Sequence, residues 1–375
     1  MTESALHHDT PEARRYNRIH RRLNVADAAL MVIMLVVVLV TGWTHSLHAL
    51  AFRISGATHY ARALFFYILM LSLIGKLLSL GLDIYSFRIE HEYHLSNQKV
   101  KSWLRDEVKG FLVSLVISAL LAEVLYAIIQ AAPIIWWLIA WAAFLLLFVL
   151  FAQIAPIVLF PIFYSFETLK NESLRERLLR LSEHAKTRVR GVYEWKLSEK
   201  SNKANAALMG LGNTRRIVIS DTLLASYTDD EVEAVMAHEL GHHVHKHIFY
   251  GIMMQAAVSF AAFWMLKTVL RKAGAYFANQ ADFSNLPLMI LVVMAMTLLL
   301  MPLMNAYSRY NEREADRYAW KSIPSVEPFI TAIDKLAEQN LAEREPSWIV
   351  EILFHSHPPV SKRIAAAEKW AGGRV

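Results

Sequence analysis

Residues 237–243, AHELGHH, have side chains whose types and spacing could hold a metal ion and hydrolyse a bond. Two histidines four positions apart lie on one face of a helix, so His238 and His242 can direct their imidazoles at a common ion. Glu239 lies one position further round, where its carboxylate can reach a water on that ion and act as a general base. The pattern predicts metal-assisted hydrolysis, with two of the metal ligands supplied here.

A catalytic zinc site takes three protein ligands and leaves one position open. The later segment YNEREADRYAW contains Glu312 and Asp316, again four apart on one helical face. We assign Glu312 as the third ligand and Asp316 as the hydrogen-bonding partner that fixes the tautomer of a ligand histidine. Glu314 points elsewhere on this helix and is expected to be a solvated charge. The alternative for Glu312 is an ion-pair face with Arg313 and Arg317.

Three more histidines follow the first pair, at His243, His245 and His247. His245 comes seven residues after His238 and shares its face, so it is the second candidate for the third ligand. Otherwise the three are expected to be polar residues at a membrane edge. The chain has no cysteine, so histidines and carboxylates must supply all protein ligands to one zinc ion per chain.

The composition indicates that these residues belong to a membrane protein. Of the 375 residues 55% are hydrophobic and 19% are charged, whereas soluble domains carry about 25% charged residues. The net charge is +6 and the pI about 9.3. Cytoplasmic loops of membrane proteins are themselves basic, so this charge does not require a nucleic-acid partner, and none is expected.

Six segments are long and apolar enough to cross a bilayer, which takes roughly 20 helical residues. The fourth is longer than one crossing and contains Pro156 and Pro161, so we expect a tilted helix that breaks or unwinds near its end. The expected spans are residues 27–47, 62–86, 111–131, 134–165, 249–270 and 286–307.

Basic residues decide the expected orientation. Five arginines precede the first span, and the loop after the second span, the polar stretch 166–248 and the C-terminal tail are also basic, whereas the alternate loops carry few charges. The positive-inside rule then places both termini and the polar stretch in the cytoplasm. We expect a multi-pass protein of a bacterial inner membrane or the endoplasmic reticulum.

The polar stretch predicts a small α/β domain between the membrane segments. ETLKNESLRERLLRLSEHAKTR has helical leucine periodicity, and VYEWKLS and RRIVISDTLL alternate as strands do. Thr228 with Glu231 forms a capping box that begins the helix of the first motif. The expected domains are an N-terminal membrane region with about four spans (1–165), a catalytic domain (166–248), two further spans (249–307) and a C-terminal catalytic segment (308–375).

Several separated stretches together resemble the integral-membrane zinc metalloproteases that include the type I CaaX prenyl proteases. They cover most of residues 83–370 in the order found in that family. Besides HELGHH and NEREADRYA they are SHPPVSKRI at 356–364, SEKSNKANAALMGLGNTRRIVISDTLL at 198–224, AQIAPIVLFPIF at 152–163, and DIYSFRIEHEYHLSNQKVKSWLRDEVKGF at 83–111.

The resemblance implies a mostly α-helical, polytopic membrane barrel that encloses a water-filled chamber, with a small α/β zinc-metalloprotease domain. It implies that substrate binds as an extended strand beside an edge strand, here NKANAALMG. By the same resemblance Asn205 would hold the substrate backbone, His357 would stabilise the oxyanion, and Arg363 would be a supporting basic residue at the substrate site. His355 is expected to be structural.

The expected activity is therefore hydrolysis of peptide bonds near the C terminus of peptides or proteins, which could be prenylated. Two features depart from the family: its eukaryotic members usually show seven spans, and the position of Ala207 is usually aromatic. A membrane-protein quality-control protease would use the same residues and is the first alternative. A non-enzymatic metal sensor or transporter is the second, although ion transport does not require a base such as Glu239.

Overall fold

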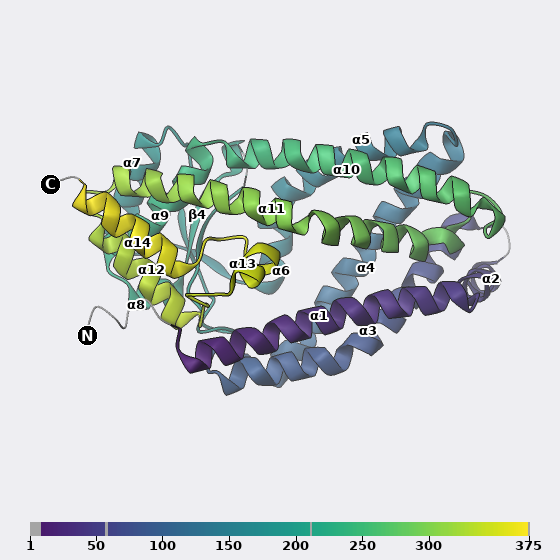
Figure 1. Cartoon of the computed structure of the whole chain (residues 1–375), viewed down its shortest axis with the longest axis horizontal. Coiled ribbons are helices and arrows are strands. Elements are labelled where there is room, and N and C mark those ends of the chain that lie inside the picture. The colour runs from purple at the N-terminus through teal and green to yellow at the C-terminus, as the bar shows by residue number, and fades with distance from the viewer. Residues whose placement is uncertain (1–8, 57–58, 211, 374–375) are drawn as a thin grey trace.

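The computed structural model describes residues 9–373, apart from residues 57, 58 and 211. Long helices run along the longest axis, while most of the shorter helices and the strands gather at one end and the short helix α2 (Trp43–Ser55) lies at the other (Figure 1). The first described helix, α1 (Pro11–Val40), begins at the end that holds the strands, and the last, α14 (Val360–Gly372), lies there too. An even number of membrane crossings would produce this arrangement.

Six helices in the described part are long and apolar enough to span a membrane, as the sequence predicts. They stand next to one another as a bundle. The bundle adjoins the end of the molecule that contains the sheet and the helices of both motifs, which we call the catalytic end. The elements are α1 (Pro11–Val40), α3 (Tyr60–Glu92), α4 (Val100–Ala131), α5 (Trp136–Ile154) with its continuation to Phe163, α10 (His247–Lys272) and α11 (Leu286–Ser322).

The first span differs from the prediction of 27–47. The helix begins at Pro11, where Thr10 caps it, and ends at Val40. Gly42 then adopts a φ of 73°, a left-handed conformation that suits glycine and ends the helix. A separate short helix, α2 (Trp43–Ser55), follows. Hydrophobicity marks the bilayer-crossing part of a helix, whereas caps decide where the helix ends.

The expected break in the fourth span is present. α5 passes into a π-helical segment, Ala155–Leu159, and then into the short α6 (Phe160–Phe163). Pro156 has no backbone N–H and therefore disturbs the regular hydrogen-bond ladder of the helix.

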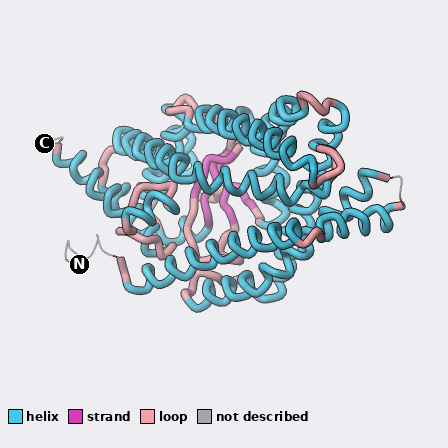
Figure 2. The backbone as a smooth tube through the Cα atoms, turned by 45° about the vertical axis from the view of Figure 1, so that its right-hand side comes forward, coloured by secondary structure: helices cyan, strands magenta, loops and turns pink. Residues whose placement is uncertain are grey.

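A four-stranded sheet lies among the helices (Figure 2), with strand order β1-β2-β4-β3. β1 (Phe166–Thr168) and β3 (Ala206–Met209) are antiparallel to their neighbours, while β2 (Val192–Trp195) and β4 (Arg216–Ser220) pair in parallel. β3 is an edge strand with one strand partner. The segment NKANAALMG therefore leaves a sheet edge open.

Two element boundaries in this region differ from the prediction. The strand expected to run to Leu224 ends at Ser220, whose hydroxyl caps the short helix α8 (Asp221–Ser226). The helix expected from Glu167 begins at Glu172, because Phe166–Thr168 pairs with β2. α7 (Glu172–His184) is otherwise helical as expected.

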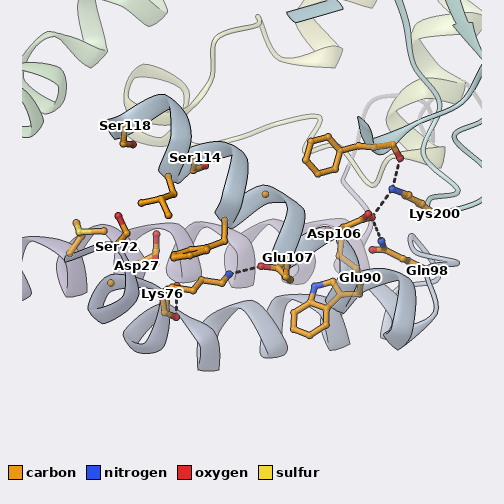
Figure 3. A pocket seen from close by; sticks show the side chains of 18 of the residues that line it. Asp27, Ser72, Lys76, Glu90, Gln98, Asp106, Glu107, Ser114, Ser118 and Lys200 are labelled. Atoms are coloured by element: carbon orange, nitrogen blue, oxygen red, sulfur yellow. Dashed lines mark hydrogen bonds and ion pairs between the residues drawn. The ribbon is translucent and has the colours of Figure 1, made fainter. Parts of the chain in front are cut away.

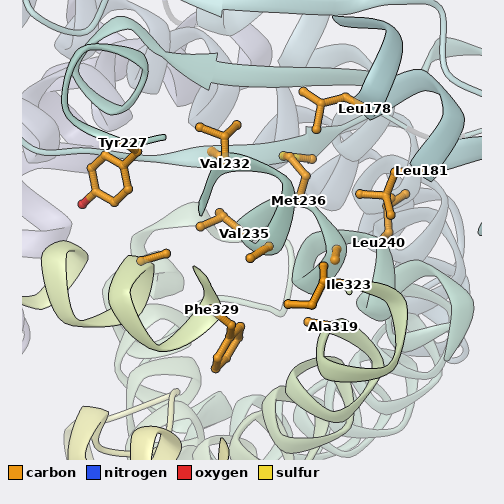
Figure 4. Close-up of a cluster of buried hydrophobic side chains, with 14 of the residues drawn as sticks. Leu178, Leu181, Tyr227, Val232, Val235, Met236, Leu240, Ala319, Ile323 and Phe329 are labelled. Atoms are coloured by element: carbon orange, nitrogen blue, oxygen red, sulfur yellow. The ribbon is translucent and has the colours of Figure 1, made fainter. Parts of the chain in front are cut away.

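The helix that carries the first motif, α9 (Asp229–Val244), is buried on all its faces. It packs in a core (Figure 4) with side chains from α7, α11 and α12 (Glu327–Gln339). Burial of each large aliphatic or aromatic side chain stabilises the fold by about 1.5–3 kcal/mol, which holds the turn with the histidine pair rigid. The core includes Leu178, Leu181, Val232, Met236, Leu240, Ala319, Ile323 and Phe329.

α11 joins the membrane region to the catalytic end. It continues without a break through the predicted boundary at residue 307 as far as Ser322, so a membrane span and the second motif share one rigid helix. Two short helices, α13 (Trp348–Phe354) and α14 (Val360–Gly372), complete the C-terminal part.

A cavity of about 720 Å³ lies among α1, α3 and α4 (Figure 3). Its wall includes an ion-paired lysine, Lys76, whose Nζ lies 2.7 Å from Asp83 Oδ2 and also contacts Glu107. Tyr164 and Ser201 line both this cavity and the cleft that contains the first motif, so the two spaces adjoin.

Candidate active site

α9 and α11 bring three candidate metal ligands together. His238 Nε2 lies 3.2 Å from His242 Nε2 and 3.2 Å from Glu312 Oε2. His242 Nε2 lies 3.3 Å from Glu312 Oε1. The alternative in which Glu312 forms an exposed ion-pair face does not occur, since Glu312 is buried and faces the two histidines. The three residues form a group that could hold a metal ion, and His245 is not part of it.

The spacing of these atoms fits a tetrahedral zinc ion. Zinc–ligand bonds of about 2.0–2.1 Å at tetrahedral angles place ligand atoms about 3.4 Å apart, close to the separations observed here. Glu312 Oε2 is also buried without a hydrogen-bond partner among the described residues. Buried carboxylate oxygens normally have a donor or a cation beside them, so this atom fits a metal ligand.

Close contact between the two helices makes this geometry possible. A Cβ added at Gly241 would lie 2.9 Å from Ala315 Cα and 3.0 Å from the Ala315 carbonyl oxygen. Gly241 lies one residue before His242, and Ala315 lies one turn after Glu312. The absence of a side chain at Gly241 therefore sets the distance between the histidine pair and the carboxylate.

The second ring nitrogen of His238, Nδ1, contacts an acidic side chain that is itself paired with an arginine. Asp316 Oδ1 lies 2.8 Å from its Nδ1, and Arg363 contacts Asp316 with two hydrogen bonds of 2.6 and 2.9 Å. Burial disfavours protonation of His238, but the neighbouring carboxylates of Asp316 and Glu312 outweigh it and raise its pKa to about 9. The same negative surroundings favour a metal cation. Asp316 thus lies where the sequence predicts, and the Arg363 guanidinium is occupied in positioning it.

Glu239 and His357 belong to the same cleft as the histidine pair. Both line a space of about 670 Å³ together with His238. Burial raises the pKa of the Glu239 carboxyl, which brings it closer to the range where a base can accept and return a proton. His357 Nε2 lies 3.3 Å from Glu312 Oε1, and Ser356 Oγ lies 2.9 Å from its Nδ1. If the Ser356 hydroxyl donates to Nδ1, the ring carries its proton on the nitrogen that faces the site.

Asn205 lies in the same cleft, directly before the edge strand β3. Its backbone N–H donates to Ser220 Oγ at 3.0 Å, and its carbonyl accepts from Ser220 N at 2.9 Å. In an antiparallel ladder the next residue points its backbone groups the other way. Ala206 and Leu208 therefore direct their N–H and C=O groups at the open edge, while the Asn205 side chain is exposed in the cleft.

One buried histidine at this site is missing from the predicted set. His247 Nδ1 lies 3.0 Å from His242 Nδ1, and its Nε2 lies 3.2 Å from Glu314 Oε2. Glu314 is therefore half-buried and paired, and the expectation of a solvated charge is wrong for it. His247 thus contacts Nδ1 of His242, just as Asp316 contacts Nδ1 of His238. His355 also lines the cleft, where its carbonyl accepts a hydrogen bond from Arg309.

Comparisons with known proteins agree with this geometry. The model of peptidase family M48 matches residues 168–371, and the model described as "CAAX prenyl protease N-terminal, five membrane helices" matches residues 4–165. The fold is that of Ste24p from S. mikatae, with a TM-score of 0.85 at 21% identity over 98% of this chain and 89% of that one. The expected fold, a mostly helical membrane protein with a small protease domain, is confirmed.

Two relatives show how far the similarity extends in sequence. An uncharacterized metalloprotease, YhfN, of Bacillus subtilis is 34% identical over 311 residues, which cover 81% of this chain and 72% of the relative. A CAAX prenyl protease 1 homolog of Arabidopsis thaliana is 27% identical over 304 residues, 78% of this chain and 70% of the relative.

Together these matches define a metal-dependent endopeptidase embedded in a membrane by several helices. The chain belongs to peptidase family M48. This confirms the expectation of an enzyme, and it excludes the metal sensor and the transporter as the class of protein.

Proposed function

We propose that this protein is a zinc endopeptidase that cleaves peptides or proteins near a lipid-modified C terminus. The observation that carries the proposal is the convergence of His238, His242 and Glu312 at tetrahedral spacing in a cleft beside an open strand edge. We propose these three as the ligands of one zinc ion. Zinc bound there would polarise the scissile carbonyl and lower the pKa of a water.

The residues around the ligands have separate roles in this proposal. Glu239 takes a proton from the attacking water and returns it to the leaving amine. His357 donates a hydrogen bond from Nε2 to the developing oxyanion. Asp316 holds His238 in the tautomer that presents Nε2 to the metal, and Arg363 fixes Asp316 in turn.

The substrate adds to the sheet as an extended strand. Ala206 and Leu208 offer N–H and C=O groups at the open edge of β3, and the exposed Asn205 amide contacts the peptide backbone near the scissile bond. Because Ala207 is small, this sequence leaves more room beside the strand than an aromatic residue would. Arg363 acts on substrate only through the residues it positions, since its guanidinium is bound to Asp316.

The adjoining cavity among the membrane helices supports a substrate with an apolar end. Its roughly 720 Å³ would take up a lipid chain while the peptide lies along β3. Each CH₂ group removed from water contributes about 0.8 kcal/mol, so burial of only two such groups favours the lipidated substrate about tenfold. The Arabidopsis relative is named a CAAX prenyl protease 1 homolog, which points to the same substrate class.

A matched pair of peptides tests the substrate class. The two peptides share one sequence, and only one of them carries an isoprenoid on a cysteine near its C terminus. We expect kcat/KM to be at least about tenfold higher for the lipidated peptide. Equal values would refute the lipid preference, and efficient cleavage of unmodified, misfolded membrane proteins would favour a quality-control protease instead.

We further propose that both termini and the catalytic end face the cytoplasm, with residues 166–248 and 308–375 forming the catalytic part. The basic N-terminal segment and loops support this orientation. Because the chain has no cysteine, labelling of a single introduced cysteine shows on which side of the membrane that position lies. In intact cells a membrane-impermeant maleimide should label A275C, between α10 and α11, and spare K170C. The reverse pattern would contradict the orientation.

A further inference from the structure

A second hollow borders the cleft at the catalytic end. Residues of α11, α13 and α14 enclose a groove of about 630 Å³. This volume lies within the roughly 300–1,000 Å³ typical of small-molecule sites. We refer to it as the basic groove. Its lining includes Arg313, Asp316, Arg317, Trp320, Glu351 and Lys369.

The charges that line the basic groove are unbalanced. Both of its acids are already neutralised, Asp316 by Arg363 at 2.6 Å and Glu351 by Lys362 at 2.6 Å. Arg313, Arg317 and Lys369 form no ion pair with any described residue. Arg313 and Arg317 are exposed and four apart on α11, so their guanidinium groups lie next to each other on one helical face. The groove thus presents three positive charges without a counter-ion.

A buried donor in the wall also lacks an acceptor. Trp320 is only 5% exposed and lines the groove, yet its indole N–H has no hydrogen-bond partner among the described residues. Buried indole N–H groups normally find an acceptor. That nitrogen is itself fully buried and does not open onto the groove, so the three unpaired cations alone call for a ligand with negatively charged oxygens.

The distance of the groove from the bilayer indicates whether that ligand is a lipid headgroup or a dissolved anion. The expected span on α11 ends at residue 307, and a helix rises 1.5 Å per residue, so Arg317 lies about 15 Å beyond the apolar region and Trp320 about 20 Å. The headgroup layer is only about 5–8 Å thick on each side. The groove therefore lies mostly above the headgroups and is open to dissolved anions.

We propose that the basic groove binds a phosphate-bearing anion. Arg313 and Arg317 supply paired guanidinium groups, which match phosphate oxygens, and Lys369 adds charge from the opposite wall. The groove adjoins the substrate cleft, with which it shares Pro358 and Arg363, but its three unpaired cations line the groove alone. The proposal goes beyond the peptidase activity, and its test does not depend on peptide cleavage.

Inorganic pyrophosphate is a suitable probe, and its binding to the full chain in nanodiscs of neutral lipid can be followed by titration calorimetry. We expect saturable binding that weakens with added salt. R313Q/R317Q should lower the affinity at least about tenfold, since each charged hydrogen bond it removes is a strong one. R18Q/R22Q is the matched control, because Arg18 and Arg22 are likewise exposed and four apart on α1, far from the groove, and it should bind as wild type does.

Nanodiscs of acidic phospholipid distinguish the two sources of phosphate. If pyrophosphate binds in neutral discs and still binds in acidic ones, the ligand is a dissolved phosphate. Loss of pyrophosphate binding in acidic discs, together with stabilisation of wild type but not of R313Q/R317Q by acidic lipid, identifies a lipid headgroup. No saturable binding overturns the proposal. Binding of equal strength to R313Q/R317Q also overturns it, because the two arginines then do not hold the anion.

Discussion

Substitution of Gly241 by alanine tests the contact that brings the two halves of the metal site together. The new Cβ would lie 2.9 Å from Ala315 Cα, whereas carbon atoms in contact prefer about 3.5 Å or more. α9 and α11 must therefore move apart by about 0.6 Å. Metal sites tolerate changes of only about 0.2 Å in ligand distance. Because Glu312 lies one turn from Ala315, the displacement weakens its bond to a metal held by His238 and His242.

The expected effect is larger on activity than on stability. Overpacking costs about 1–3 kcal/mol, but alanine is about 1 kcal/mol better than glycine within a helix, so the net loss is about 0–2 kcal/mol. A misplaced ligand lowers kcat/KM about 100-fold. Titration with a competing chelator measures metal affinity, and a peptide assay measures kcat/KM. G251A is the control, since a Cβ at Gly251 of α10 meets open space. Wild-type metal affinity and activity in G241A would refute the reasoning.

Three further substitutions test individual contacts. H357A should lose about 100- to 1000-fold in kcat with its metal content unchanged, and loss of the metal would contradict the oxyanion role. H247A should free the ring of His242 and weaken metal affinity about 10- to 100-fold without unfolding the chain; unchanged affinity in chelator titrations would show that this hydrogen bond is dispensable. Burial raises the pKa of Glu231, but Lys335 and the Thr228 backbone N–H outweigh it and lower that pKa. Its carboxylate therefore contributes stability that is present above about pH 4.3 and is lost as the pH falls through the folded-state pKa. E231Q should lower the free energy of unfolding by about 1–2 kcal/mol at neutral pH. In chemical denaturation its stability should also fall less with decreasing pH than that of wild type, and an unchanged fall would contradict this.

The convergence of the proposed ligands could be predicted in part because helices repeat every 3.6 residues. His238 with His242 and Glu312 with Asp316 each share a face, and in the structure the two faces meet. The sequence does not show that Gly241 is the point of closest approach, although a glycine beside a ligand is a signal for it. Nor does it show that Arg363 is bound to Asp316 instead of substrate, since the two are far apart in the chain.

The role of His247 could not be predicted from spacing. Lys246 adopts a left-handed conformation, with a φ of 56°, between α9 and α10. This turn directs the His247 ring back toward His242, although a continuous helix would place residues five apart on different faces. In the same way, hydrophobicity predicts the six spans but does not predict where α1 begins. Its polar first turns are ordered by contacts far along the chain, such as the bond from Asn17 to the Leu341 carbonyl.

The central claim is that a zinc ion on His238, His242 and Glu312 works with Glu239 as the proton-transferring base. The most direct test measures metal content and peptide cleavage of purified E239A. The account predicts one zinc per chain, as in wild type, and cleavage reduced by about 10²- to 10⁴-fold. Cleavage near the wild-type rate in zinc-loaded E239A would contradict the claim.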